Sequence, residues 1–169
     1  MNIEDAIYRG YLAWSPSPST TNLDVWVDDH VPMAGTLMIE GATIAFSAIL
    51  EPTEAVSVWI YAELNPAEVA FLGDHVFEDV HDADDYLNSV FSSRPVAYAT
   101  TRDYRIRQFS LCDLKGRSPV KGALDFLRMV SDALTLMAPK SSDGSVVAKS
   151  SEVEQIDVEA EKFKRLVSA

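Results

Sequence analysis

The residues best suited to chemistry in this chain lie in one short stretch, Gly73 to Asp85, with the sequence GDHVFEDVHDADD. It contains two of the chain's three histidines and six carboxylates. Imidazole nitrogens and carboxylate oxygens are ligands of divalent metals, and oxygen-rich clusters bind Mg²⁺ without a fixed spacing. If a metal binds here, we expect Asp79, His81 and Asp82 to be its ligands.

The spacing within this stretch matches no metal-binding template. A calcium-binding EF-hand loop needs oxygen ligands at positions 1, 3 and 5, glycine at 6 and glutamate at 12. A loop counted from Asp79 has His81, Ala83, Asp84 and Val90 at positions 3, 5, 6 and 12. The chain has no His-Glu-x-x-His motif, and its single cysteine cannot form a cysteine-rich zinc site.

A structural role explains the same acids more simply. Asp82 is expected to be the N-cap of a helix over residues 83–92, with Asp84 and Asp85 in its first turn. Negative charge there is stabilised by the helix dipole by roughly 0.3 to 1 kcal/mol per residue. The inward side of this helix would consist of Leu87, Val90 and Phe91. We therefore interpret the stretch as a solvated acidic edge and helix start, with the metal site as the alternative.

A second candidate site is basic. Arg102, Arg105 and Arg107 lie on or beside one predicted strand, with Tyr98 and Tyr104 near in sequence. Guanidinium groups beside aromatic rings suit contacts with phosphate, carboxylate or nucleic-acid bases, although a solvated strand face explains the same pattern. The chain lacks a P-loop and a Gly-x-Ser-x-Gly nucleophile motif, so the sequence assigns no catalytic residue.

The elements that position these residues include a hairpin. Apolar side chains lie at odd positions at Leu37 and Ile39, and the phase changes at Glu40-Gly41. They then lie at even positions at Ile44, Phe46, Ala48 and Leu50. A tight turn there pairs Leu37 with Ile44. Because residues opposite each other in an antiparallel pair point the same way, both apolar sets then lie on one face.

A third strand follows, with strict alternation from Val56 to Leu64. Pairing it so that Phe46 lies opposite Ile60 continues the apolar face and gives an antiparallel meander. Trp59 and Tyr61 then lie on the other face. They would either be covered by a helix or form an exposed aromatic anchor for a partner.

Strands are also predicted from Leu23 to near Pro32 and over residues 96–101 and 104–111. Ser118-Pro119 then begins a helix that runs to about Ala138, with a polar stripe so narrow that the helix should be largely buried. The sequence therefore predicts the α+β class, with an antiparallel meander of about five or six strands packed against one long buried helix.

The domain organisation follows from these elements. Residues 1–138 are predicted to form a single domain, residues 139–151 a flexible linker, and residues 152–169 a tethered amphipathic helix. Ile156 and Phe163 lie on the apolar stripe of that last helix. It would either dock on its own domain or insert into the groove of a partner.

The charge of the chain limits its partners. The net charge is −12, and the isoelectric point is near 4.5. This opposes non-specific binding to nucleic acid and to anionic membranes. Residues 1–93 contain one basic side chain against sixteen acidic ones, whereas residues 94–150 contain ten basic against five acidic. One cysteine, Cys112, and no long apolar run lead us to expect a cytoplasmic protein.

These observations lead to two functional hypotheses. The first is a non-enzymatic acidic interaction module, an accessory or inhibitor subunit that needs no cofactor and binds a basic surface of a protein partner. Its expected contact residues are Trp59, Tyr61, Asp84, Asp85, Ile156 and Phe163. Self-association is also compatible with the sequence. The alternative is a metal-dependent hydrolase, in which the acids hold Mg²⁺ and Arg102, Arg105 or Arg107 take the phosphate of the substrate.

Overall fold

The fold is a six-stranded antiparallel sheet with three helices, seen in a computed structural model that describes residues 22–29, 32–39, 41–50, 57–102 and 105–137. The strands are β1 (Leu23–Asp28), β2 (Pro32–Ile39), β3 (Ala42–Leu50), β4 (Ser57–Glu63), β5 (Pro95–Arg102) and β6 (Arg105–Asp113). The helices are α2 (Pro66–Asp74), α3 (Val80–Ser92) and α4 (Pro119–Met137). The α+β class and the antiparallel meander are thereby confirmed.

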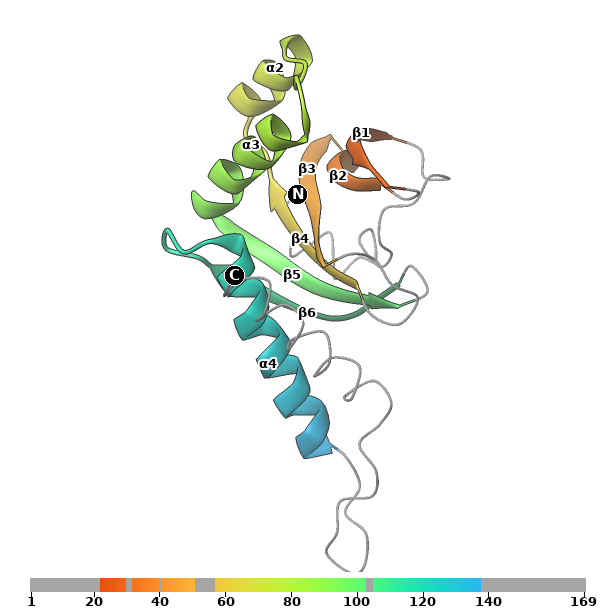
Figure 1. Cartoon of the computed structure of the whole chain (residues 1–169), viewed down its shortest axis with the longest axis vertical. Helices are drawn as coiled ribbons and strands as arrows, with labels where there is room; N and C mark the ends of the chain where they lie inside the picture. Colours follow the sequence, from red (N-terminus) through yellow and green to blue (C-terminus); the bar gives the residue numbers. More distant parts are fainter. Residues whose placement is uncertain (1–21, 30–31, 40, 51–56, 103–104, 138–169) are drawn as a thin grey trace, which may run out of the picture.

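The strands follow one another across the sheet in chain order, β1 to β6, and every neighbouring pair is antiparallel. Helices α2 and α3 form a hairpin inserted between β4 and β5, which remain direct neighbours. Figure 1 shows this α2–α3 hairpin projecting from one end of the sheet, with α4 beside β5 and β6. None of the helices in the described part of the chain combines the length and apolar character needed to cross a bilayer.

The predicted turn between β2 and β3 is confirmed. Leu37 lies opposite Ile44, and Ile39 opposite Ala42. Gly41 has a φ of 84°, a backbone conformation that glycine adopts without steric cost. The change of hydrophobic phase in the sequence therefore marks the hairpin correctly.

The predicted register between β3 and β4 is wrong by one residue. Phe46 lies opposite Tyr61, and Ile60 lies opposite Ser47. Because successive side chains of a strand point to opposite faces, a shift of one residue exchanges the faces of β4. Trp59 and Tyr61 therefore share a face with Phe46 and Leu37.

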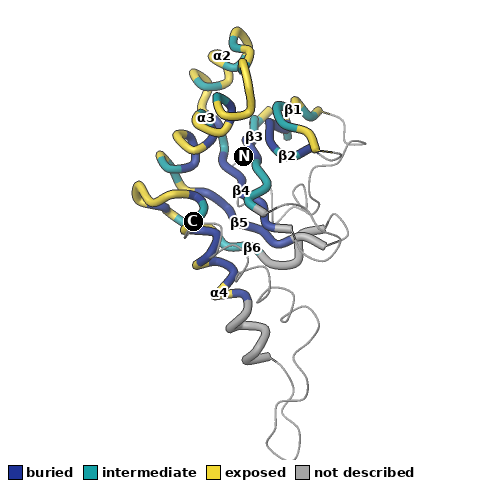
Figure 2. Tube along the Cα trace, in the orientation of Figure 1, coloured by how far each residue is buried: buried dark blue, intermediate teal, exposed yellow. Residues whose placement is uncertain are grey.

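The sheet is apolar on both sides. One face, together with α3 and α4, forms a cluster that includes Val58, Ile60, Phe91 and Leu127. The other face carries a second cluster, which in the described part of the chain consists of strand residues alone: Leu37, Ile44, Phe46, Trp59, Tyr61, Ala97 and Ala99. Figure 2 shows the centre of the sheet as mainly buried, whereas α2 has no buried residue.

Helix α4 begins as predicted and is anchored through its first turns. The Tyr98 hydroxyl donates a hydrogen bond of 2.6 Å to the Pro119 carbonyl, and the Tyr98 ring stacks on Phe126 at 5.9 Å between centroids. Gly122 lies so close to Tyr98 that a Cβ there would be 2.4 Å from the hydroxyl oxygen. Over residues 119–130 the helix has one buried side and one exposed side that includes Lys121, so it is not buried all round.

Two parts of the predicted organisation lie outside the described residues. They are the linker over residues 139–151 and the carboxy-terminal helix over residues 152–169.

Candidate functional site

The α2–α3 hairpin begins with a capping box. The Asn65 side chain accepts hydrogen bonds from the amides of Ala67 and Glu68, at 2.9 and 3.0 Å, and the Glu68 carboxylate accepts one from the Asn65 amide at 2.8 Å. These contacts satisfy amide groups at the helix start that have no partner within the helix. Pro66 occupies the first turn, where its missing amide hydrogen is not needed.

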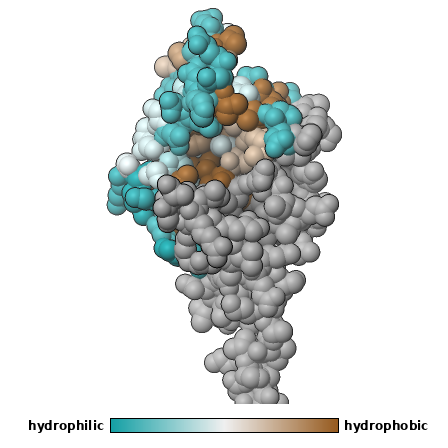
Figure 3. Space-filling model, viewed as in Figure 1, coloured by the Kyte–Doolittle hydropathy of each residue, from teal (hydrophilic) through white to brown (hydrophobic). Residues whose placement is uncertain are grey.

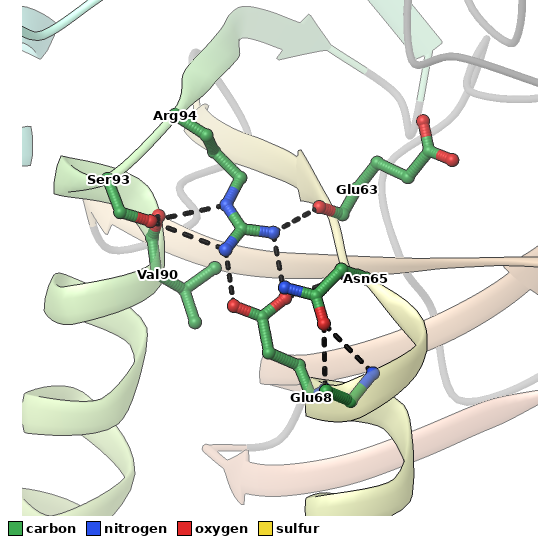
Figure 4. A network of polar contacts seen from close by, with 7 residues as sticks. Glu63, Asn65, Glu68, Val90, Ser93 and Arg94 are labelled. Carbon is green, nitrogen blue, oxygen red and sulfur yellow. Dashed lines mark hydrogen bonds and ion pairs between the residues drawn. The ribbon is translucent and has the colours of Figure 1, made fainter.

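Arg94 holds this helix start against the sheet (Figure 4). Its guanidinium donates to both carboxylate oxygens of Glu68 and, at 2.7 Å, to the carbonyl of Glu63 at the end of β4. Burial alone raises the pKa of Glu68, but the hydrogen bonds from Arg94 and Asn65 and the charge of Arg94 outweigh it, so the pKa lies below its usual value. Arg94 therefore holds the first turn of α2 next to the end of β4.

Helix α3 begins three residues earlier than predicted. Its N-cap is Asp79, whose carboxylate accepts a hydrogen bond of 2.9 Å from the amide of Asp82. Asp82 lies in the first turn, accepts a hydrogen bond of 3.3 Å from the amide of Glu78, and lies 3.5 Å from the Nε2 atom of His75. Both aspartates thus organise the backbone at the helix start. The predicted inward residues are confirmed, since Leu87, Val90 and Phe91 are all buried.

The described residues contain no group of three or more His, Cys, Asp or Glu side chains placed to hold a metal ion. Of the three predicted metal ligands, Asp79 caps α3, Asp82 lies in its first turn, and His81 is exposed between them. The structure gives the metal hypothesis no support, and it stays a prediction that a metal titration can test.

An aromatic cluster joins the hairpin to β1. Phe71 of α2 stacks on His75 and on Tyr86 of α3, with centroid distances of 4.6 and 5.6 Å. Phe77 lies 5.6 Å from Tyr86 and 4.7 Å from Trp26 of β1. Contacts of this kind contribute beyond the burial of their area and hold the rings in defined orientations.

The outer side of the hairpin is apolar as well as acidic. Four large hydrophobic side chains are exposed there, with exposed fractions of 38% for Val69, 47% for Phe71, 85% for Val76 and 50% for Val80. In the space-filling view of Figure 3, hydrophobic atoms lie among hydrophilic ones at this projecting end. We call these four residues, with the carboxylates of residues 74–85, the α2–α3 surface.

The charge of this surface is uncompensated within the hairpin. Residues 65–93 contain seven acidic side chains and no lysine or arginine. Arg94, the next basic residue, already pairs with Glu68. The predicted contact residues Asp84 and Asp85 are both exposed on α3. Partial burial raises the pKa of Asp84 and the nearby Asp85 charge adds to this, while His81 acts in the opposite direction.

Trp59 and Tyr61 are not an exposed aromatic anchor. Their exposed fractions are 1% and 0%, because the register of β4 directs both into the second apolar cluster. Ile156 and Phe163, the other predicted apolar contacts, lie outside the described residues.

The three predicted anion-binding arginines lie at the β5–β6 hairpin. Arg102 is the last residue of β5 and lies opposite Arg105, the first residue of β6. Arg107 lies two residues further along β6. The backbone thus brings the three positions to one end of the sheet, while their side chains lie outside what the structure describes.

Sequence reasoning overlooked the exposed apolar residues of the hairpin. Val69, Phe71 and Val76 lie in or just after a helix of nine residues, which is too short to give a clear periodic signal beside the acidic segment. The available signal was a helix with apolar residues on several sides next to an acidic segment, a combination that one buried face cannot accommodate.

The comparisons with known proteins found no match. The chain matches no family model, no curated protein and no solved structure. The function must therefore be argued from the α2–α3 surface itself.

Proposed function

We propose that this chain is a non-enzymatic interaction module, an accessory or inhibitor subunit that binds a basic surface of a protein partner through the α2–α3 surface. The observation that carries the proposal is that α2 has no buried residue although Val69 and Phe71 are apolar. Exposed apolar groups rimmed by polar ones are typical of protein interaction sites.

Charge supports a basic partner. Residues 65–93 carry seven carboxylates and no lysine or arginine. This segment therefore repels nucleic acid and anionic lipid and attracts lysine and arginine side chains. Electrostatic attraction of this kind mainly speeds association and selects partners. The complex should therefore weaken as salt concentration rises.

The test is a pull-down with the tagged full-length chain from a lysate of the native host, at low and high salt, with the bound proteins identified by mass spectrometry. The charge variant is D74N/D84N/D85N, which removes three exposed carboxylates and leaves both helix caps intact. We expect a basic partner at low salt and its loss both at high salt and with this variant.

The matched control is E152Q/E154Q/E159Q, which makes the same change in net charge in the carboxy-terminal segment. This control should retain the partner. Retention by the D74N/D84N/D85N variant together with loss by the control would move the contact to the carboxy-terminal segment and refute the proposed site. If no partner appears at either salt concentration, the interaction function itself is refuted.

A further inference from the structure

The side of α2 that faces away from the molecule carries an uncovered apolar stripe. Pro66, Val69, Ala70 and Gly73 fall at positions i, i+3, i+4 and i+7, which places them on one side of the helix, and all four are exposed. This spacing is the pattern with which an amphipathic helix packs on a core. The other side of α2 is already engaged, because Glu68 pairs with Arg94 and Leu72 packs against the main core.

The stripe is shaped for another helix. Ala70 and Gly73 are small, and a Cβ added at Gly73 would meet no atom within 4 Å, so the space beside it is open. Small residues allow two helix axes to approach closely, at distances near the lower end of about 8–10 Å. With nine residues, α2 is about 13 Å long and offers two to three turns of contact.

Larger apolar side chains lie beside the stripe and beyond it. Phe71, half exposed, is held by stacking on His75 and Tyr86, so its ring is oriented before any partner arrives. Val76 and Val80 continue the apolar surface past the end of α2. Apolar anchors held in place by their neighbours lose little conformational freedom on binding.

Charge selects among the possible occupants of this stripe. A second copy of the chain docking through the same surface would bring Asp74 and Glu78 against like charges, which disfavours a symmetric contact. A helix with lysine or arginine beside its apolar side would instead meet opposite charges.

Building on the proposed function, we infer that the partner segment is a basic amphipathic α-helix that packs its apolar side along Pro66, Val69, Ala70 and Gly73. Its lysine and arginine side chains pair with the carboxylates of residues 74–85. In this mode of recognition, the bound helix contacts an apolar surface through apolar side chains at positions i, i+3, i+4 and i+7.

The test uses two synthetic peptides of identical leucine and lysine composition with a fluorescent label. In the first, leucine recurs at i, i+3, i+4 and i+7; in the second, the order is scrambled so that no apolar side forms. Fluorescence anisotropy with the full chain at physiological salt should show the first peptide binding at least about tenfold more tightly than the second.

The blocking variant is A70Q/G73Q, which fills the stripe at two exposed positions of the helix. It should weaken binding of the first peptide by about tenfold or more. The matched control, M38Q, changes an exposed apolar residue on β2 and should leave binding unchanged. Circular dichroism of each variant verifies that the fold is kept.

The outcomes separate the inference from the proposed function. If the scrambled peptide binds as tightly as the helical one, or A70Q/G73Q binds like wild type, the helix inference is wrong while a basic partner stays supported. If neither peptide binds, the helix inference is refuted, while the proposed function is decided by the pull-down. A dimer in sedimentation that A70Q/G73Q abolishes would assign the stripe to a second copy and overturn the inference.

Discussion

Replacing Arg94 with alanine tests how the α2–α3 hairpin is held on the sheet. The variant removes the ion pair with Glu68 and the hydrogen bond to the Glu63 carbonyl. We expect the free energy of unfolding at pH 7 to fall by about 2 kcal/mol. The cap between Asn65 and Glu68 remains possible in the variant, so the loss reports the Arg94 contacts.

The magnitude follows from the burial of the pair. The side chains of Arg94 and Glu68 are 20% and 21% exposed, so the pair is neither fully exposed nor fully buried. An exposed ion pair contributes about 0–1 kcal/mol, and disrupting a buried pair costs about 3–5 kcal/mol. We therefore expect a value between these ranges. Chemical denaturation measures the change directly. In thermal unfolding it corresponds to a fall in Tm of about 4–8 °C for a chain of this size. The control R128A removes a pair with Asp125 in which both side chains are more than half exposed, and it should change stability by less than about 0.5 kcal/mol.

The effect of R94A should depend on pH with a defined sign. The pKa of Glu68 is lowered in the folded state, so its contribution is present above the pKa of the unfolded chain, near 4.3, and is lost as pH falls through the folded value. The gap between wild type and R94A should therefore be constant from pH 8 to about pH 5 and narrow in acid. A gap below about 0.5 kcal/mol at pH 7, or one that widens in acid, would refute the role given to this pair.

Three further predictions concern buried groups and metal binding. Y98F should lower the free energy of unfolding by about 1 kcal/mol, because it removes the buried hydrogen bond that the Tyr98 hydroxyl donates to the Pro119 carbonyl. Y61F should be neutral or stabilising, because the Tyr61 hydroxyl is buried without a hydrogen-bond partner in the described part of the chain; equal effects of the two variants in denaturant titrations would contradict this. G122A should destabilise by about 1–3 kcal/mol, because the added methyl clashes with Tyr98 and Leu114, and an unchanged melting curve would show that the helix shifts freely. Saturating Mg²⁺ or Mn²⁺ should leave Tm unchanged, because no metal-binding cluster occurs among the described residues; a rise in Tm with metal concentration would restore the hydrolase hypothesis.

Local signals in the sequence predicted much of the sheet. The turn at Gly41 could be found because the hydrophobic phase changes there, and the pairing of Leu37 with Ile44 follows from the turn alone. The ends of α4 could be placed from Ser118-Pro119 and Pro139 for the same reason, since capping and proline act on neighbouring residues.

The register of β4 could not be predicted in this way. Val58 and Ile60 on one side and Trp59 and Tyr61 on the other are all apolar or aromatic, so either register buries a hydrophobic face. A register shift between Ala48 and Leu50 adds a change that the pattern does not show. In a sheet with two apolar faces, the hydrophobic pattern of a strand therefore does not determine its register.

The N-cap of α3 and the exposure of α2 could not be predicted for a related reason. Asp79 and Asp82 are both good N-cap residues, and only the folded chain shows that Asp79 caps while the amide of Asp82 donates to it. The stripe of Val69, Ala70 and Gly73 can be read from its spacing. Whether such a stripe is covered depends on where the rest of the chain packs, which spacing along one helix does not determine.

The lack of any buried residue in α2 has a consequence for its motions. A helix that contributes little to the core can open while the sheet stays folded, so its amide hydrogens should exchange with solvent far sooner than those of β3, β4 and β5. Arg94 limits this opening at one end only, where it holds Glu68. Any molecule that covers the outer side of α2 must slow that exchange, so deuterium uptake by this one helix would report binding even before the partner has been named.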